Sequence, residues 1–352
     1  MNRLNLYRLK TRLTTAALAV AAASATCIPV TAASFTASTF ATGTAVAGTQ
    51  PDSVSFGGGS LWIEYGNGAS STDFSGTSTI VQYSPTAAVQ HTWQIAGSVD
   101  GLKYDPSTGM VWALQNQDAN SRLSLINPST KAVTSYTYGA PYTSSSATRG
   151  FDDVAFIGNN VYMSETNPAT TSDPVIVKLT NSTPTSPVTM TTVQTGAGIA
   201  ATDADSLKST PTGGLILTGE ADGALNFIDN PGQANQSARS IKLSGANGFS
   251  IGNPDDAIYA TSTAGIFYVT DTSTNQVLAI NATGLTPGTL FVNVGDTFGS
   301  VDPSTGVVTP LVSGTGLHGM DFVATPEPST LGFILLAAGI AAVFTYRRRH
   351  AS

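Results

Sequence analysis

Short segments in which hydrophobic and polar residues alternate recur along the chain about every fifty residues. The third residue of each is apolar, and the fifth is aromatic in every copy but one. Alternation with a period of two is typical of β-strands with one buried face. Five copies begin with an aspartate and a degenerate sixth begins with a histidine: Asp52, Asp100, Asp152, Asp205, Asp255 and His318.

A turn and a second strand follow the first five copies. The turns read GGGS, DPSTG, IGNN, TPTGG and TSTAG, and the second strands LWIEY, MVWAL, VYMSE, LILTG and IFYVT. Glycine, asparagine and proline at these places favour hairpins, and further apolar runs bring each repeat to about four antiparallel strands. Repeats of this kind pack radially. We therefore predict an all-β fold, a β-propeller of five or six blades with six favoured; a β-sandwich or an irregular solenoid is the alternative.

The segment SFTASTFATGTAVAG, before Asp52, is expected to complete the last blade. An open ring would leave sheet edges unpaired, so joining the two ends of the chain is the economical closure. In architecture the body, residues 34–325, resembles NHL-type and related six-bladed propellers.

The N-terminal 33 residues have the pattern of a secretory signal peptide. Basic residues stand at Arg3, Arg8, Lys10 and Arg12, and a small-residue apolar stretch follows. Val30 and Ala32 suit the −3 and −1 positions of signal peptidase, so we expect cleavage after Ala32 or Ala33.

The C-terminal segment, residues 326–352, has three parts in a fixed order. Pro326, Glu327 and Pro328 precede an uncharged apolar run over residues 331–346, and Arg347, Arg348 and Arg349 follow. The run of 16 residues is shorter than the roughly 20 of a typical membrane span, but flanking arginines can compensate by snorkelling. The basic end favours the cytoplasm, which leaves the body outside. We predict a transmembrane helix here.

This order resembles the PEP-CTERM sorting signal of Gram-negative bacteria. The resemblance implies processing by an exosortase and then release or attachment at the cell surface, often beside exopolysaccharide. An ordinary membrane anchor is the alternative; the two differ in whether the tail survives.

Charge and cysteine content narrow the class of protein. Without its two ends the body keeps eight basic and 21 acidic residues, a net charge of about −13. Such a balance argues against binding to nucleic acid, which requires a basic face. The single cysteine, Cys27, lies in the predicted signal peptide, so the exported body has no disulfide.

Acidic residues are expected to gather at one mouth of the propeller channel. In a hairpin, the start of the first strand and the end of the second lie at the same edge. This places a ring of acids there: Asp52, Asp100, Asp152, Asp205 and Asp255 from the first strands, with Glu64, Glu165, Glu220 and Asp271 from the second. Carboxylates this close repel one another unless a cation or hydrogen bonds relieve them, and oxygen ligands suit Ca²⁺. Simple capping of turns by aspartate is the competing interpretation.

These observations predict an exported protein with a non-catalytic binding or scaffolding propeller at the cell surface or in the extracellular matrix. No catalytic residue is assigned. The alternative is a metal-dependent hydrolase or lactonase that uses the acidic ring at the channel mouth.

Overall fold

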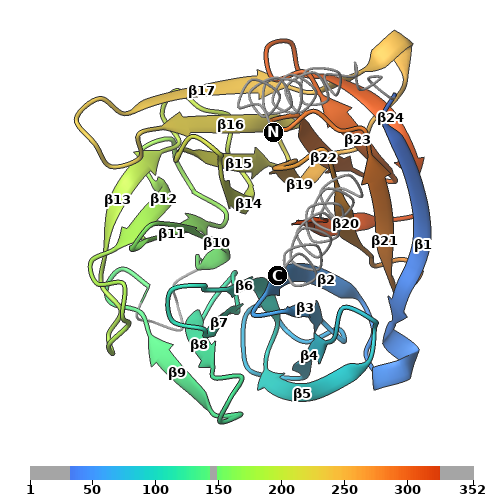
Figure 1. Cartoon of the computed structure of the whole chain (residues 1–352). Coiled ribbons are helices and arrows are strands. Elements are labelled where there is room, and N and C mark those ends of the chain that lie inside the picture. The colour runs from blue at the N-terminus through green and yellow to red at the C-terminus, as the bar shows by residue number, and fades with distance from the viewer. Residues whose placement is uncertain (1–31, 143–148, 326–352) are drawn as a thin grey trace, which may run out of the picture. The chain divides into compact units, whose positions relative to one another are not determined.

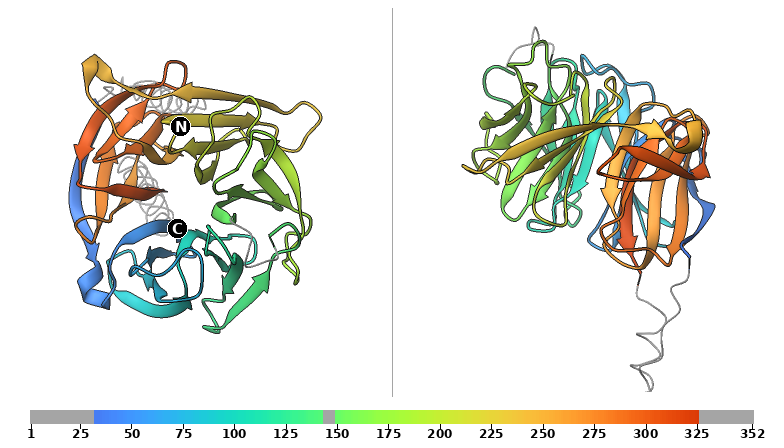
Figure 2. Two further views of the ribbon diagram at one scale, coloured as in Figure 1. Left: turned by 180° about the vertical axis from the view of Figure 1, so that it is seen from behind. Right: turned by 90° about the horizontal axis from the view of Figure 1, so that it is seen from above.

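The computed structural model describes residues 32–142 and 149–325. These residues form 25 strands in six sheets, five of four strands and one of five. The sheets surround a central axis as the blades of a six-bladed propeller, which confirms the predicted fold and the favoured blade count (Figure 1). Figure 2 shows the same ring from behind and from above.

The first four blades each take four consecutive strands of the chain, ordered from the axis outward. Blades 1 and 2 comprise β2 (Pro51–Gly57), β3 (Ser60–Tyr65), β4 (Thr77–Tyr83), β5 (Val89–Ala96), β6 (Val99–Tyr104), β7 (Val111–Gln115), β8 (Arg122–Ile126) and β9 (Val133–Thr137). Blades 3 and 4 comprise β10 (Phe151–Ile157), β11 (Asn160–Glu165), β12 (Pro174–Leu179), β13 (Met190–Thr195), β14 (Ala204–Ser209), β15 (Leu215–Gly219), β16 (Ala224–Asp229) and β17 (Ser237–Lys242).

The last two blades are interleaved along the chain. Blade 5 has the order β19-β22-β23-β24-β18, and blade 6 has the order β25-β20-β21-β1. The inner strand β19 is therefore not followed by its hairpin partner, because the chain first crosses to blade 6. The strands are β1 (Ser34–Thr42), β18 (Ser244–Gly245), β19 (Pro254–Tyr259), β20 (Ala264–Asp271), β21 (Gln276–Thr283), β22 (Leu290–Val294), β23 (Thr297–Val301), β24 (Val307–Ser313) and β25 (Leu317–Ala324).

This interleaving corrects one expectation from the sequence. The segment TSTAG was expected to join two strands of one hairpin, but β19 pairs antiparallel with β22 and β20 pairs with β25. Ala257 lies opposite Val292, and Val269 lies opposite Met320. The local residues suit a turn, but β20 joins the sheet of the adjacent blade, because it pairs there with β21 and β25.

The N-terminal strand closes the ring, as the sequence predicted. β1 is the outermost strand of blade 6 and pairs antiparallel with β21, with Ser34 opposite Thr283 (Figure 1). Across the same sheet, Ala264 lies opposite Thr283 and Gly265 lies opposite Ala324. The first residue of β1 and the last residue of β25 therefore lie at the same edge of the blade.

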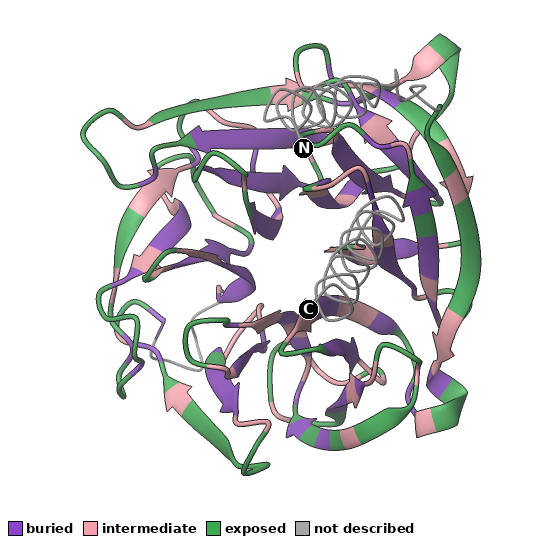
Figure 3. Ribbon diagram, in the orientation of Figure 1, coloured by how far each residue is buried: buried purple, intermediate pink, exposed green. Residues whose placement is uncertain are grey.

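Packing between neighbouring blades forms the core. Trp112 of blade 2 packs with Phe151 and Met163 of blade 3 in one buried cluster, and similar clusters fill the other boundaries. Second strands of the blades such as β3 and β7 are buried throughout, whereas outer strands such as β9 and β17 are mostly exposed (Figure 3). The innermost strands combine buried and partly exposed residues, because one of their faces lines the channel.

Two short 3-10 turns complete the described chain, Gly43–Val46 and Ala246–Gly248. Within residues 32–142 and 149–325, no helix is long and apolar enough to cross a membrane. The predicted sorting segment, residues 326–352, and nearly all of the predicted signal peptide lie outside the described residues.

Candidate functional site

All six inner strands carry the same irregularity at the position of the repeated acid. In β6, Val99 lies opposite Gln115 and Leu102 opposite Ala113, so two residues face one on the neighbouring strand. This is a β-bulge, which bends the strand and redirects its side chains. The bulged pairs are Asp52–Ser53, Asp100–Gly101, Asp152–Asp153, Asp205–Ser206, Asp255–Asp256 and His318–Gly319. The bulge allows two consecutive residues of one strand to line the channel.

The bulges bring five predicted aspartates to a single narrow space on the axis. This cavity of about 20 Å³ is lined by both residues of several bulges, including Asp152 with Asp153 and Asp255 with Asp256. A water molecule requires roughly 10–15 Å³, so this space accommodates about one water or ion. The five predicted aspartates that line it are Asp52, Asp100, Asp152, Asp205 and Asp255.

The first residues of the six bulges form one layer of the channel, which we call the upper layer. Its one basic residue is His318, whose side chain is partly exposed. Its Nδ1 lies 2.8 Å from Oδ2 of Asp255 and 3.3 Å from Oδ1 of Asp52. Burial alone would lower the pKa of His318, but hydrogen bonds and charges from Asp255 and Asp52 outweigh burial and raise it to about 11. These three residues also form the one histidine–carboxylate group within the described chain whose ligand atoms lie close enough to share a metal.

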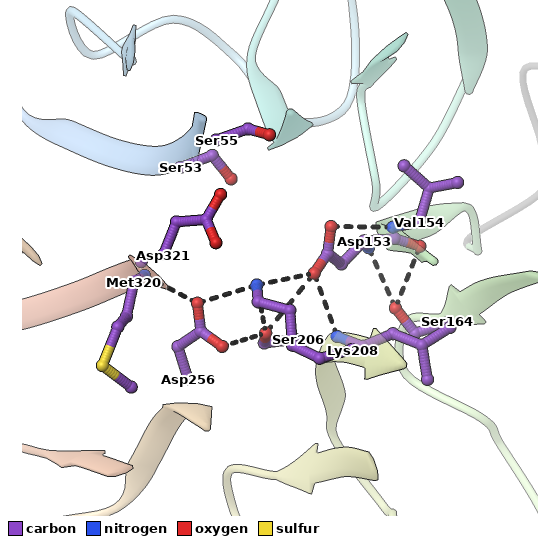
Figure 4. A network of polar contacts seen from close by, with 12 residues as sticks. Ser53, Ser55, Asp153, Val154, Ser164, Ser206, Lys208, Asp256, Met320 and Asp321 are labelled. Atoms are coloured by element: carbon purple, nitrogen blue, oxygen red, sulfur yellow. Dashed lines mark hydrogen bonds and ion pairs between the residues drawn. The ribbon is translucent and has the colours of Figure 1, made fainter. Parts of the chain in front are cut away.

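The second residues of the bulges form the lower layer, which contains a buried cation, Lys208. Its Nζ lies 2.8 Å from Oδ2 of Asp256 and 3.2 Å from Oδ2 of Asp153, and it donates to Ser206 Oγ at 3.0 Å (Figure 4). Burial would lower the pKa of this ammonium, but the charges of Asp153 and Asp256 outweigh it and raise the pKa instead. The layer therefore places one ammonium beside two carboxylates, and donors such as the Ser206 hydroxyl and the backbone N–H groups of Leu207 and Met320 complete the network.

Three further carboxylates of the upper layer have no such cation beside them. Within the part of the chain that the structure describes, no lysine, arginine or histidine forms an ion pair with Asp100, Asp152 or Asp205. The pKa of each is raised well above its usual value, first by burial and then by neighbouring aspartates. Burial and mutual repulsion therefore favour the protonated form of these groups, and a bound cation would favour the charged form.

Glu64 lies beside the upper layer and is fully buried, with no ion-pair partner among the described residues. Its two carboxylate oxygens accept no hydrogen bond of normal geometry from the described residues. Burial and the negative charge of Asp52 raise the pKa of Glu64 well above its usual value, and the nearby Ser78 hydroxyl offsets part of this shift. Glu64 lines a hollow of about 200 Å³ together with Gln50, Asp52 and His318.

The other predicted acids differ in their surroundings. Burial and then Asp203 raise the pKa of Glu220, which lies within electrostatic reach of His318. Glu165 has local partners, an ion pair of 3.0 Å with Arg149 and a hydrogen bond from the hydroxyl of Tyr142. Asp271 accepts hydrogen bonds from Thr315 and from the backbone N–H of Thr274.

Sequence reasoning missed the lower layer. Strict alternation would turn Asp153 and Asp256 away from the channel, because each directly follows a channel aspartate. The bulge reverses this, and the only signal in the sequence was the doubled aspartate in two of the six copies.

Comparison with known proteins finds distant structural similarity for the body and a family match for the C-terminal end. No curated protein matches the chain. Solved structures of similar fold include a putative gluconolactonase (11% identity, TM-score 0.49, 80% of this chain and 83% of that one). A periplasmic gluconolactonase, PpgL, of Pseudomonas aeruginosa is 13% identical, with a TM-score of 0.46 over 78% of this chain and 89% of that one. Virginiamycin B lyase of Staphylococcus aureus is 12% identical, with a TM-score of 0.43 over 84% and 76%. At these values they carry no inference about activity.

The C-terminal end matches a family model. Residues 324–349 match the PEP-CTERM protein-sorting motif. The match includes Pro326, Glu327, Pro328 and the three arginines at 347–349. The chain therefore carries a PEP-CTERM sorting motif, which marks it for export, exosortase-mediated anchoring through its C-terminus and display at the cell surface.

Proposed function

We propose that the displayed propeller is a non-catalytic binding or scaffolding module whose channel holds one divalent cation. The observation that carries this proposal is a set of three channel-lining carboxylates, Asp100, Asp152 and Asp205, that have no counter-cation within the described residues, whereas Asp52 and Asp255 at the same level pair with His318. The free space of about 20 Å³ suits a single ion and excludes an organic substrate. A cation there would stabilise the ring by neutralising carboxylates contributed by separate blades.

Ca²⁺ is the candidate ion for Asp100, Asp152 and Asp205, because all of their side-chain donors are oxygens. Zn²⁺ is the competing ion, since the imidazole of His318 beside Asp52 and Asp255 is a donor set that suits it. Bound cations would displace protons from Asp100, Asp152 and Asp205, whose pKa values are raised.

Melting of the body, residues 34–325, in Ca²⁺, Mg²⁺ or Zn²⁺ tests this proposal. At a concentration of about 100 times the Kd, a bound ion should raise the Tm by roughly 5 °C, and a chelator should reverse the rise. The double variant Asp152→Asn/Asp205→Asn should lose the response, while Asp229→Asn, an exposed aspartate at the end of β16, should keep it. A response to no ion, or an equal response in the double variant, would refute the cation site.

A second candidate function, a metal-dependent hydrolase or lactonase, is favoured by the hollow that Glu64 shares with Asp52 and His318. Its volume of about 200 Å³ gives a small substrate room beside the possible metal ligands. A panel of lactones and esters assayed with each metal distinguishes the two functions. Hydrolysis that disappears in Glu64→Gln while the melting response remains would support the enzyme; absence of turnover with every metal would leave the binding module.

A further inference from the structure

A larger cavity lies at the opposite end of the channel, where the inner strands end. Its volume is about 450 Å³, which is within the usual range for small-molecule sites. The fifth residues of five repeats line it, one aromatic side chain from each of five blades: Phe56, Tyr104, Phe156, Tyr259 and Phe322. We call this space the lower-mouth pocket.

These aromatic side chains are held in place on one side and half-exposed on the other. Phe156 contacts Trp112 edge-on with ring centroids 5.5 Å apart, and the ring of Phe322 lies 4.6 Å from that of Phe267. Tyr104 lies against the backbone at Gly57, where a Cβ atom would come within 2.1 Å of the tyrosine ring. The pocket is therefore preformed by packing and its aromatic surface needs no rearrangement to receive a ligand.

The polar groups of the lower-mouth pocket include one cation without an ion-pair partner among the described residues, Lys103, and one carboxylate, Asp321, that is hydrogen-bonded to backbone N–H groups. Lys208 lines the inner end but is paired with Asp153 and Asp256, and Asp321 accepts the backbone N–H groups of Phe56 and Phe322 at 2.6 and 2.8 Å. No carboxylate in residues 32–142 or 149–325 forms an ion pair with Lys103. The pocket thus presents this ammonium on a chain whose net charge is −7.

We propose that the lower-mouth pocket binds a small organic anion with a flat apolar body, of the aryl carboxylate class. Its ring system would pack among the aromatic side chains, and its carboxylate would accept a charge-assisted hydrogen bond from Lys103. Apolar walls from Pro106, Pro211 and Ile258 favour such a body over a saccharide, whose hydroxyl groups need many hydrogen-bond partners. This inference goes beyond the proposed function, since the pocket and the cation layers occupy different ends of the channel.

The test compares two probes of the same shape, 2-naphthoate and the neutral 2-naphthalenemethanol. Calorimetry on the full chain in lipid nanodiscs, with empty nanodiscs subtracted, measures both affinities. The carboxylate should bind about tenfold more tightly, as expected for one charge-assisted hydrogen bond. Ca²⁺ and chelator are varied separately, so that a failure of the cation proposal remains distinguishable from a failure here.

Matched variants locate the site. Lys103→Met should weaken naphthoate about tenfold and leave the alcohol unchanged, Lys103→Arg should retain both affinities, and Phe156→Leu should weaken both probes. Lys242→Met, at an exposed lysine of the outer strand β17, is the control and should change neither. Equal affinities for the two probes, an unaffected Lys103→Met protein, or binding of an oligogalacturonate in preference to naphthoate would overturn the proposal. Melting curves establish that each variant is folded.

Discussion

Asp256 accepts a hydrogen bond from the backbone N–H of Met320 at 2.6 Å with the same carboxylate oxygen that lies 2.8 Å from Lys208. The three residues come from β19, β25 and β14, which are the inner strands of three blades. Asp153 of β10 extends the network to a fourth blade. Buried ions on the axis therefore connect four blades, in addition to the apolar packing between neighbouring blades.

Replacement of Lys208 tests this connection. Lys208→Met should reduce the free energy of unfolding by about 3–5 kcal/mol, because two buried carboxylates lose their counter-charge. The triple variant Lys208→Met/Asp153→Asn/Asp256→Asn should recover part of the loss. Urea denaturation measures both; a loss below about 1 kcal/mol in the single variant would show that the network contributes little.

Stability should also depend on pH through Glu165. Burial raises its pKa from 4.5 to about 7 in the folded protein, although Tyr142 and Arg149 partly oppose the shift. Between these two values the unfolded chain releases the proton more readily, so stability falls as pH rises through this window and levels off above it. The fall attributable to this group is at most about 3 kcal/mol.

Glu165→Gln isolates that contribution. Urea denaturation from pH 4 to 8 should give a smaller decline for this variant than for the unmodified protein, and the two curves should diverge with rising pH. Parallel curves would mean that Glu165 has the same pKa in both states.

Closure of the ring depends on aromatic contacts of β1. Phe40 contacts Tyr268 and Tyr83 at ring-centroid distances of 5.0 and 5.8 Å, and Phe35 contacts Phe291 at 5.9 Å. Since both phenylalanines are partly buried, Phe35→Ala and Phe40→Ala should each cost about 2 kcal/mol. The double variant should also associate, because a loosened β1 exposes the edge of β21.

Val89→Ala is the control for closure, since this valine is exposed on the outer strand β5. Urea denaturation and size-exclusion chromatography report the two effects. A double variant that stays monomeric at unchanged stability would show that β1 is dispensable.

The sorting motif gives a prediction for cells. Replacing Pro326, Glu327 and Pro328 with alanine should leave the protein in the membrane fraction with its C-terminal segment intact, because the motif is what the sorting protease recognises. Mass spectrometry of the C-terminal peptide in membrane and surface fractions measures this. Unaltered appearance of a shortened protein at the surface would place the recognition signal elsewhere; the pocket variant Lys103→Met should be sorted normally.

The architecture could be predicted from the sequence because each blade repeats the same inner strand. The spacing of Asp52, Asp100, Asp152 and the later copies favoured six blades, which the structure has. The strand before Asp52 closes the ring as expected. The interleaving of blades 5 and 6 could not be predicted in this way. The segment around Ala264 has the local composition of a turn, and only pairing with a distant strand determines its sheet.

The candidate site, like the fold, was predicted only in part. The first residue of each bulge was predicted as a channel residue from its repetition. Asp153, Asp256 and Lys208 were not, because a bulge changes which side chains face the axis and leaves no regular signal in the sequence. The lower-mouth pocket was equally hidden, since its aromatic residues serve first as alternating core positions.

The interleaved blades make the order of export matter. The predicted N-terminal signal peptide implies export from that end, and β20 and β21 would then emerge well before β25, the inner strand that they need. Blade 5 has all of its strands by Ser313, whereas blade 6 lacks its innermost strand until β25 has passed the membrane. That strand ends at Ala324, two residues before the sorting motif's Pro326. The strand that completes the ring and the sorting motif are thus direct neighbours in the chain, so blade 6 can be completed only when the sorting motif is next to emerge.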